Sequence, residues 1–242
     1  MKQLISFTIK AEFGMFKKPD INDKIFVSYN IIHKPYILGI MGAIMGYGGY
    51  AQNIDTSKMP QYYDKFKDMQ IAISPINESG IFKKEFIIFN NTTNGTTSNI
   101  TEQTLIKPSY RIYLELDSQK EGELILRLKN REAVYLPYMG KNEFSLWWED
   151  FKIHEKFEKV DLKEKFQVKT IIKKPKKFVV KNSGYKERTT NYFYLFERLP
   201  IDFDMELKQY KYHDFLYTNA VFKNSNGLEN LYECDEGVIC LF

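Results

Sequence analysis

The hydrophobic and polar positions in the first half of the chain alternate in the manner of short strands separated by two helices. Strand character is predicted for four apolar runs, at residues 3–10, 69–76, 82–89 and 110–116. Helical spacing predicts helices at 36–47 and 122–131, and residues 134–138 are predicted to form the last strand. This order of parts predicts a β-α-β-β-α-β, ferredoxin-like domain, the plan that RNA-recognition modules use.

The predicted helix at 36–47 is apolar and carries glycines at positions 39, 42 and 46. That spacing places the three glycines on one helical face, where they let the backbone press closely against a sheet. Pro35 suits the first turn of the helix. The apolar run is much shorter than the roughly 20 residues of a transmembrane helix, so a buried packing helix is expected.

A polar stretch from Asn90 to Thr101 separates the central strand regions. It is too polar to pack and too long for a tight turn, which predicts the mobile tip of a long β-hairpin near residues 90–105. After about residue 150 the pattern changes to β-like runs at 166–172, 178–180 and 192–196. The chain is therefore predicted to be α+β, with a ferredoxin-like domain at 1–149 that carries a hairpin thumb, and a smaller β-rich part at 150–242.

Composition narrows the function classes without selecting one. The chain of 242 residues is 43% hydrophobic and 16% aromatic, which is typical of a globular protein. Its net charge of +4 is modest, but residues 152–186 contain twelve lysines against four acids. Such a run is either a solvated face or a site of non-specific attraction to phosphates.

Metal and cofactor chemistry has little support in the sequence. Cys234 and Cys240 are the only cysteines and lack nearby histidines, so we expect reduced thiols, no metal and no cofactor. The N-terminus has no secretory leader pattern and no run long enough to span a bilayer follows, which favours a cytoplasmic location without membrane contact.

Several segments, taken in order, resemble a known protein family. They are Phe13 to Pro19, Ser28-Tyr29, Pro35 to Gly49, Tyr135 to Phe144, Glu197 to Pro200, Tyr217 to Asn219 and Leu241-Phe242. Together they resemble the fifth family of CRISPR-associated proteins, here called Cas five, in the RAMP superfamily. The last three segments resemble the C-terminal signature of its type I-B branch, so the similarity spans nearly the whole chain.

The resemblance implies a non-catalytic, RNA-binding subunit of the type I-B CRISPR Cascade interference complex, which serves antiviral defence. Such a subunit caps the 5' handle of the crRNA, contacts the Cas seven backbone subunit through its thumb and helps seat a large Cas eight-type subunit. Target DNA is met only through the complex, since base pairing with the guide reads its sequence. A single-stranded handle suits protein recognition, because splayed bases can be stacked and 2'-hydroxyls distinguish RNA from DNA.

The residues that the resemblance places beside the handle come from the N-terminal block, the base of the thumb and the glycine turn. Lysines would neutralise phosphates, Ser28 and Asn142 would donate hydrogen bonds, and Tyr29 would stack on a base. The full set of predicted RNA-binding residues is Phe16, Lys17, Lys18, Ser28, Tyr29, His33, Lys34, Lys107, Arg111, Lys141 and Asn142.

Two other functions stay open on the sequence. The type I-C branch of the family resembles a metal-independent endoribonuclease that processes pre-crRNA with a tyrosine, a lysine and a histidine. Here Tyr47 and the reversed pair His33-Lys34 supply those types, and no Lys-His pair follows in the central strands, so we expect no catalysis. Alternatively, the lysine run and the aromatic cluster would serve protein contacts alone, the cluster being Trp147, Trp148, Phe151 and Phe157.

Overall fold

The computed structural model describes residues 2–20, 25–55, 57–93, 95–176, 192–204, 206–207 and 209–242. Its central element is a four-stranded antiparallel sheet with the order β10-β1-β9-β6. In chain order its strands are β1 (Lys2–Ala11), β6 (Gln70–Pro75), β9 (Ser109–Asp117) and β10 (Leu146–Ile153). Helix α1 (Lys34–Met45) lies between β1 and β6 in the sequence, and helix α3 (Gly122–Asn130) lies between β9 and β10. This connectivity is ferredoxin-like, so the predicted α+β fold is confirmed.

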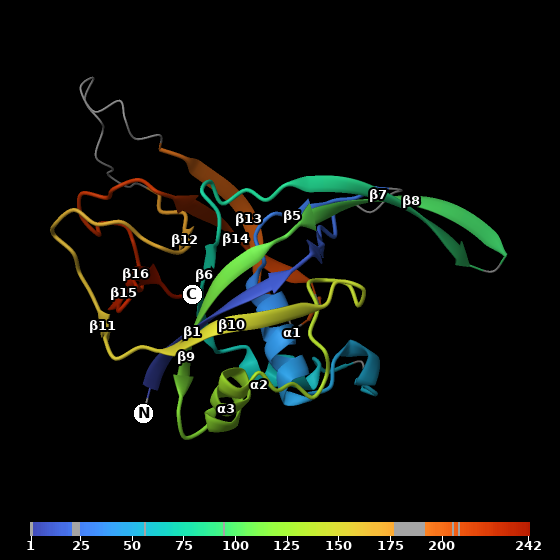
Figure 1. Cartoon of the computed structure of the whole chain (residues 1–242), viewed down its shortest axis with the longest axis horizontal. Coiled ribbons are helices and arrows are strands. Elements are labelled where there is room, and N and C mark those ends of the chain that lie inside the picture. The colour runs from blue at the N-terminus through green and yellow to red at the C-terminus, as the bar shows by residue number, and fades with distance from the viewer. Residues whose placement is uncertain are drawn as a thin grey trace.

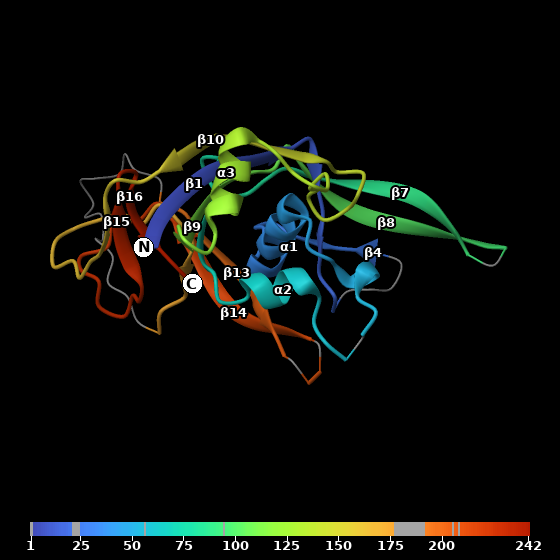
Figure 2. The same cartoon turned by 90° about the horizontal axis from the view of Figure 1, so that it is seen from below.

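The two faces of the sheet differ in the way that strand alternation requires. Ile5 and Phe7 of β1 are fully buried in the core beneath α1 and α3, while Ser6 and Thr8 point to the opposite face. In Figure 2, α1 lies between this sheet and the β13–β14 hairpin (Tyr194–Phe203 and Tyr210–Thr218), whose Phe215 joins the same core. Helix α1 is therefore covered on two sides.

The prediction of a last strand at 134–138 is wrong. These residues instead close the C-terminal end of α1, because Val134 N–H donates to Ile44 O at 3.1 Å and Tyr135 N–H to Ala43 O at 3.0 Å. Helix ends leave carbonyl groups without partners, and this segment satisfies two of them. The last strand of the sheet is β10, in which Trp148 is buried and donates from its indole to Leu128 O at 2.8 Å.

The glycines of α1 do not face the sheet. The prediction that they let this helix press its backbone against the sheet is therefore wrong. A side chain at Gly42 would clash with Tyr62 of the short helix α2 (Gln61–Phe66), and Gly39 faces the same ring. Gly46 ends α1 in the left-handed conformation, with φ of 78°. The glycines therefore allow a close approach of α2.

A long two-stranded hairpin, β7 (Lys84–Thr93) and β8 (Thr96–Ile106), projects from the body in Figure 1. The expectation that residues 90–101 are too long for a tight turn is wrong, because most of them lie in the paired strands β7 and β8. Asn-Gly is the sequence most favoured in two-residue hairpin turns, and Gly95 has φ of 77°. The long hairpin itself is confirmed.

Short strands tie the N-terminal loop to this hairpin. β2 pairs with β8, β4 runs parallel to β8, and β3 pairs with β5. Their bounds are β2 (Phe13–Gly14), β3 (Phe16–Lys17), β4 (Ile25–Phe26) and β5 (Ser28–Tyr29), and a 3-10 turn, η1 (Tyr50–Gln52), follows α1.

The remaining strands form two small sheets, with the orders β12-β14-β13 and β11-β15-β16. Their bounds are β11 (Phe157–Lys159), β12 (Ile172–Lys173), β15 (Leu231–Cys234) and β16 (Gly237–Cys240). Of the predicted runs, 166–172 contributes only its end to a strand, 192–196 begins β13, and 178–180 lies outside the described residues. Strand β10 passes through residue 149, and the division into domains at 149 and 150 stays a prediction.

Candidate nucleic-acid interface

The outer side of α1 forms the floor of a groove. Tyr36, Gly39 and Ala43 follow one another at helical spacing and line a cavity of about 310 Å³. The opposite side of the helix, which includes Ile37 and Met41, is buried in the core. Gly39 has no side chain, so the floor is deep at its middle.

Four further tyrosines make the walls of this cavity, and each comes from a different element. Tyr50 lies in η1, Tyr62 in α2, Tyr138 in the turn before β10, and Tyr210 in β14. Tyr50 and Tyr138 are 56% and 41% exposed, so their rings are open to a ligand. Gly140 completes the turn at φ of 89°, where a side chain would clash with the Met15 carbonyl.

The cavity continues into a first hollow, with which it shares Tyr50 and Tyr210. That hollow shares Asp20 and Tyr212 with a second one. The last hollow ends at Lys18 and Arg198. We call the whole surface the tyrosine groove, defined by Tyr29, Tyr36, Tyr50, Tyr62, Tyr138, Tyr210 and Tyr212.

The phenols of Tyr36, Tyr62 and Tyr210 are uncharged at neutral pH. Burial raises the pKa of Tyr36 to about 12 and also raises the pKa of Tyr62 and Tyr210. The charged side chains lie at one end, where Asp20 and Glu197 line the last hollow together with Lys18 and Arg198. There Lys18 Nζ lies 5.0 Å from the ring centre of Tyr29, and the Arg198 guanidinium 5.3 Å from that of Tyr212. The groove therefore offers neutral aromatic faces beside cations, the combination that binds single-stranded nucleic acids.

The predicted N-terminal block divides into buried supports and surface cations. Phe16 is fully buried against Tyr36, and Ser28 accepts a hydrogen bond from Phe16 N–H at 2.9 Å and donates to Tyr29 O at 2.6 Å. Lys17 is partly exposed, with Nζ 3.4 Å from the ring centre of Phe26. Lys17 and Lys18 are thus the members of this block that can meet a phosphate.

His33 and Lys34 lie inside the protein. The His33 ring is 1% exposed, and neither of its nitrogens has a hydrogen-bond partner among the described residues. Burial lowers the pKa of His33 to about 3, so the ring is neutral at pH 7. Lys34 Nζ donates to Phe242 O at 3.3 Å, and burial lowers its pKa to about 8. An RNA contact by His33 or Lys34 stays a prediction. Such a contact requires the residues that cover these side chains to move.

The glycine turn is connected to the thumb through Lys141. Its ammonium contacts both carboxylate oxygens of Glu102, at 3.0 and 3.2 Å, and lies 4.7 Å from the ring centre of Phe89. Glu102 is 3% exposed, so this ion pair holds the turn against β8. Asn142 and Lys107 are exposed, and within the described residues no ion pair holds either side chain. Their contacts with RNA stay a prediction.

Arg111 lies on the other face of the sheet, away from the tyrosine groove. Its guanidinium donates to both oxygens of Glu236, at 2.6 and 3.2 Å, and to Ser6 Oγ at 2.7 Å. Tyr113 donates to the same carboxylate at 2.7 Å. The structure does not bring Arg111 together with the other predicted residues, and its phosphate contact stays a prediction.

One motif behind the family resemblance has a structural role that the sequence did not reveal. Glu197 accepts hydrogen bonds from the backbone N–H groups of Asn30 and Ile31, at 2.8 and 2.9 Å. The Asn30 side chain in turn donates to Gly80 O and accepts from Phe82 N–H. Strand β13 therefore fixes the loop that carries Tyr29 at the end of the groove.

Clusters of metal-binding side chains and membrane-spanning helices are both absent from the described ranges. No group of three or more His, Cys, Asp or Glu side chains there is placed to hold a metal ion, and no helix there has the length and apolar character to cross a bilayer. His33 precedes the 12-residue helix α1 and Tyr47 follows it, a separation of about 18 Å along the helix. These two side chains do not face one reacting phosphate.

Comparisons with known proteins agree with this fold. No family model and no curated protein matches the sequence. Among solved structures, a chain described as "CRISPR RNA-guided surveillance complex" is 10% identical, with 92% of each chain covered and a TM-score of 0.49. A chain of the "Type III-B Cmr-beta bound to cognate target RNA and AMPPnP" is also 10% identical, over 92% of this chain and 86% of that one, with a TM-score of 0.50. At this identity the second match shows a shared fold and nothing finer.

Proposed function

We propose that this chain is a non-catalytic RNA-binding subunit of a CRISPR effector complex, of the type I-B branch of the Cas five family. In this role it holds the 5' handle of the crRNA in the tyrosine groove. The observation that carries the proposal is the convergence of seven tyrosines from six separate elements or loops on one groove with cations at its end. Base stacking on such rings is tolerant of sequence and contributes about 1–3 kcal/mol per base.

The fold and the sequence resemblance support the same role. A chain of similar fold belongs to the structure described as Type III-B Cmr-beta bound to cognate target RNA. The thumb supplies a surface for a neighbouring subunit, since Phe86 and Ile88 on one face of β7 are 62% and 68% exposed. Exposed apolar side chains on a projecting ribbon are typical of contact with a partner. We assign that contact to the Cas seven backbone subunit and assign the seating of the large Cas eight-type subunit to the same complex.

A binding titration of the purified chain tests the proposal. Labelled handle RNA and a scrambled RNA of equal length are titrated at several salt concentrations in EDTA, and each sample is also run on a denaturing gel. We expect tighter binding of the handle and intact RNA. Equal, weak binding of both RNAs, also in the presence of the backbone subunit, would overturn the proposal.

The predicted phosphate contacts of Lys17 and Lys18 have a matched test. Replacing both Lys17 and Lys18 with alanine is expected to reduce the salt slope of handle binding by up to about two units, because each lysine that neutralises a phosphate releases counterions. Lys163→Ala/Lys165→Ala removes the same charge at exposed positions outside the groove and is expected to leave the slope unchanged. An equal reduction by both pairs would show that only net charge matters.

The absence of catalysis is part of the proposal and rests on geometry. A guide-processing ribonuclease needs a general base and a general acid at one phosphodiester. His33 is buried and Tyr47 lies beyond the far end of α1. Cleaved RNA in the EDTA samples would refute the non-catalytic role. It would support the alternative, a metal-independent endoribonuclease like that of the type I-C branch.

A further inference from the structure

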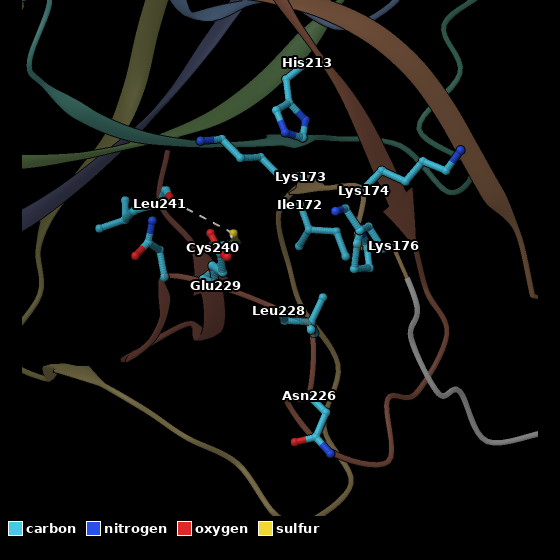
Figure 3. Close-up of a pocket in the computed structure, with 13 residues that line it drawn as sticks. Ile172, Lys173, Lys174, Lys176, His213, Asn226, Leu228, Glu229, Cys240 and Leu241 are labelled. Atoms are coloured by element: carbon cyan, nitrogen blue, oxygen red, sulfur yellow. Dashed lines mark hydrogen bonds between the residues drawn. The ribbon is translucent and has the colours of Figure 1, made fainter.

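A second cavity lies in the C-terminal half of the chain, outside the tyrosine groove. Its volume is about 730 Å³, within the range of small-molecule sites. Figure 3 shows His213 and Lys173 at one end of this cavity and Asn226 at the other, with Leu241 and Lys174 on opposite sides. We call this cavity the C-terminal pocket. Its thirteen lining residues come from the segment around β12, from β14, and from the loop and strand that end the chain.

The rim of the pocket is basic. Lys173, Lys174 and Lys176 line it, and within the described ranges none of the three forms an ion pair with a carboxylate. Lys174 Nζ instead lies 5.2 Å from the ring centre of Phe196. Lysines are densest at residues 173–177 of the lysine run, and the structure describes this stretch up to residue 176. Unpaired ammonium groups around a hollow attract an anion, and lysine meets phosphate as a point charge.

The interior of the pocket is less polar than its rim. Ile172 and Leu241 are buried beneath the opening, and the partly exposed Leu228 adds an apolar wall. The Asn226 amide and the Glu229 carboxylate also line the pocket and are exposed. An apolar wall with one amide and one carboxylate suits a nucleoside, whose flat base needs both contact area and hydrogen-bond partners.

The pocket and the tyrosine groove are separate sites that share one strand. Tyr212 and His213 are neighbours in β14 and point to opposite sides, because successive strand residues alternate. Tyr212 lines the groove, whereas His213 lines the pocket. The His213 ring is fixed there by a hydrogen bond between its Nδ1 and the Asp214 carbonyl oxygen at 2.8 Å. Changes in the pocket can therefore be made without altering the groove.

We propose that the C-terminal pocket binds one nucleotide unit, either free or as part of a single strand, with its phosphate held by Lys173 and Lys176 and its base against Leu228. This inference stands apart from the proposed function, because it rests on a different cavity. An acidic protein segment is a weaker fit, since it has no flat ring to pack against Leu228 and no donor groups as well placed for Asn226 and Glu229 as those of a base or a ribose.

The experiment measures binding of AMP, inorganic phosphate, a short oligouridine and a polyglutamate peptide to the full chain. Lys173→Gln/Lys176→Gln is expected to weaken AMP binding by about tenfold or more, as the loss of charged hydrogen bonds predicts. Asn226→Asp, at an exposed position, is expected to weaken it through repulsion without a change in melting temperature. Lys163→Gln/Lys223→Gln removes the same charge outside the pocket and is expected to have no effect.

The competition between probes identifies the source of the nucleotide. A strand in the pocket is supported if the oligouridine binds more tightly than AMP and if Lys173→Gln/Lys176→Gln abolishes the binding of both. A free nucleotide is supported if only AMP binds. The proposal is overturned if polyglutamate binds better than either. It is also overturned if phosphate competes as well as AMP, or if the two lysine pairs weaken binding equally.

Discussion

Replacing His33 with phenylalanine is expected to remove a large part of the acid sensitivity of this protein. The imidazole is packed among aromatic rings, with ring centres 5.5 Å from Tyr29, 4.6 Å from Tyr36 and 5.5 Å from Tyr210. Neither ring nitrogen has a partner within the described residues. A phenyl ring keeps the flat shape and the aromatic contacts and has no group that takes up a proton.

The magnitude follows from the lowered pKa. In the folded chain burial lowers the pKa of His33 to about 3, whereas an unfolded chain has the ordinary value near 6.5. Between these values the unfolded chain binds more protons, so the folded state loses stability as the pH falls from above 6.5 toward 3. Between pH 7 and pH 5 this linkage amounts to about 2 kcal/mol of unfolding free energy for the one residue. The phenylalanine variant lacks that loss.

Urea unfolding at pH 7 and pH 5 measures the difference, with the partly exposed His213→Gln as the matched histidine control. The wild type and the control are expected to lose about 2 kcal/mol more than His33→Phe over this interval. Equal losses in all three proteins would refute the buried, neutral state of His33. Handle binding by the same variant tests the predicted RNA contact of His33, because unchanged affinity would remove the residue from the site.

Three further outcomes test the groove and its supports. Tyr50→Ala/Tyr138→Ala is expected to weaken handle binding by about 1–3 kcal/mol per lost stacking contact. The melting temperature of this variant is expected to be unchanged. Tyr50→Phe keeps the ring and serves as the control. Gly140→Ala is expected to destabilise the fold by about 1–3 kcal/mol or more in urea unfolding, since its φ of 89° and the Met15 carbonyl both oppose a side chain. Glu197→Ala is expected to cost about 1–3 kcal/mol for each of the two backbone N–H groups it leaves unpaired, and wild-type stability would contradict this role.

Local sequence pattern was sufficient for most of the central sheet. The apolar runs at 3–10 and 110–116 and the helical spacing at 122–131 are patterns within single segments, so they can be read without the rest of the chain. Residues 134–138 have the same apolar character, yet their backbone pairs with the end of α1. Nothing within five residues distinguishes a strand from a segment that closes a helix.

The tyrosine groove is a different case, because no local signal marks it. Its members range from Tyr29 to Tyr212 and belong to separate elements that only the folded chain brings together. The sequence contains 17 tyrosines, so their number alone selects none of them. Of the seven, only Tyr29 was predicted as a binding residue. A hint was available in the segments that resemble the RNA-binding family, because Tyr29, Tyr36 and Tyr138 lie within them.

The segments behind the family resemblance line the groove, with Tyr29, Tyr36 and Tyr138 among them, and also support it from inside. Phe16 packs against Tyr36, and Ser28 ties the backbone beside Tyr29. Glu197, from the second half of the chain, holds the same loop in place through two backbone N–H groups. A motif can therefore identify the fold and the place of a site while its own side chains are buried, and the residues that meet a ligand follow only when the surrounding surface is known.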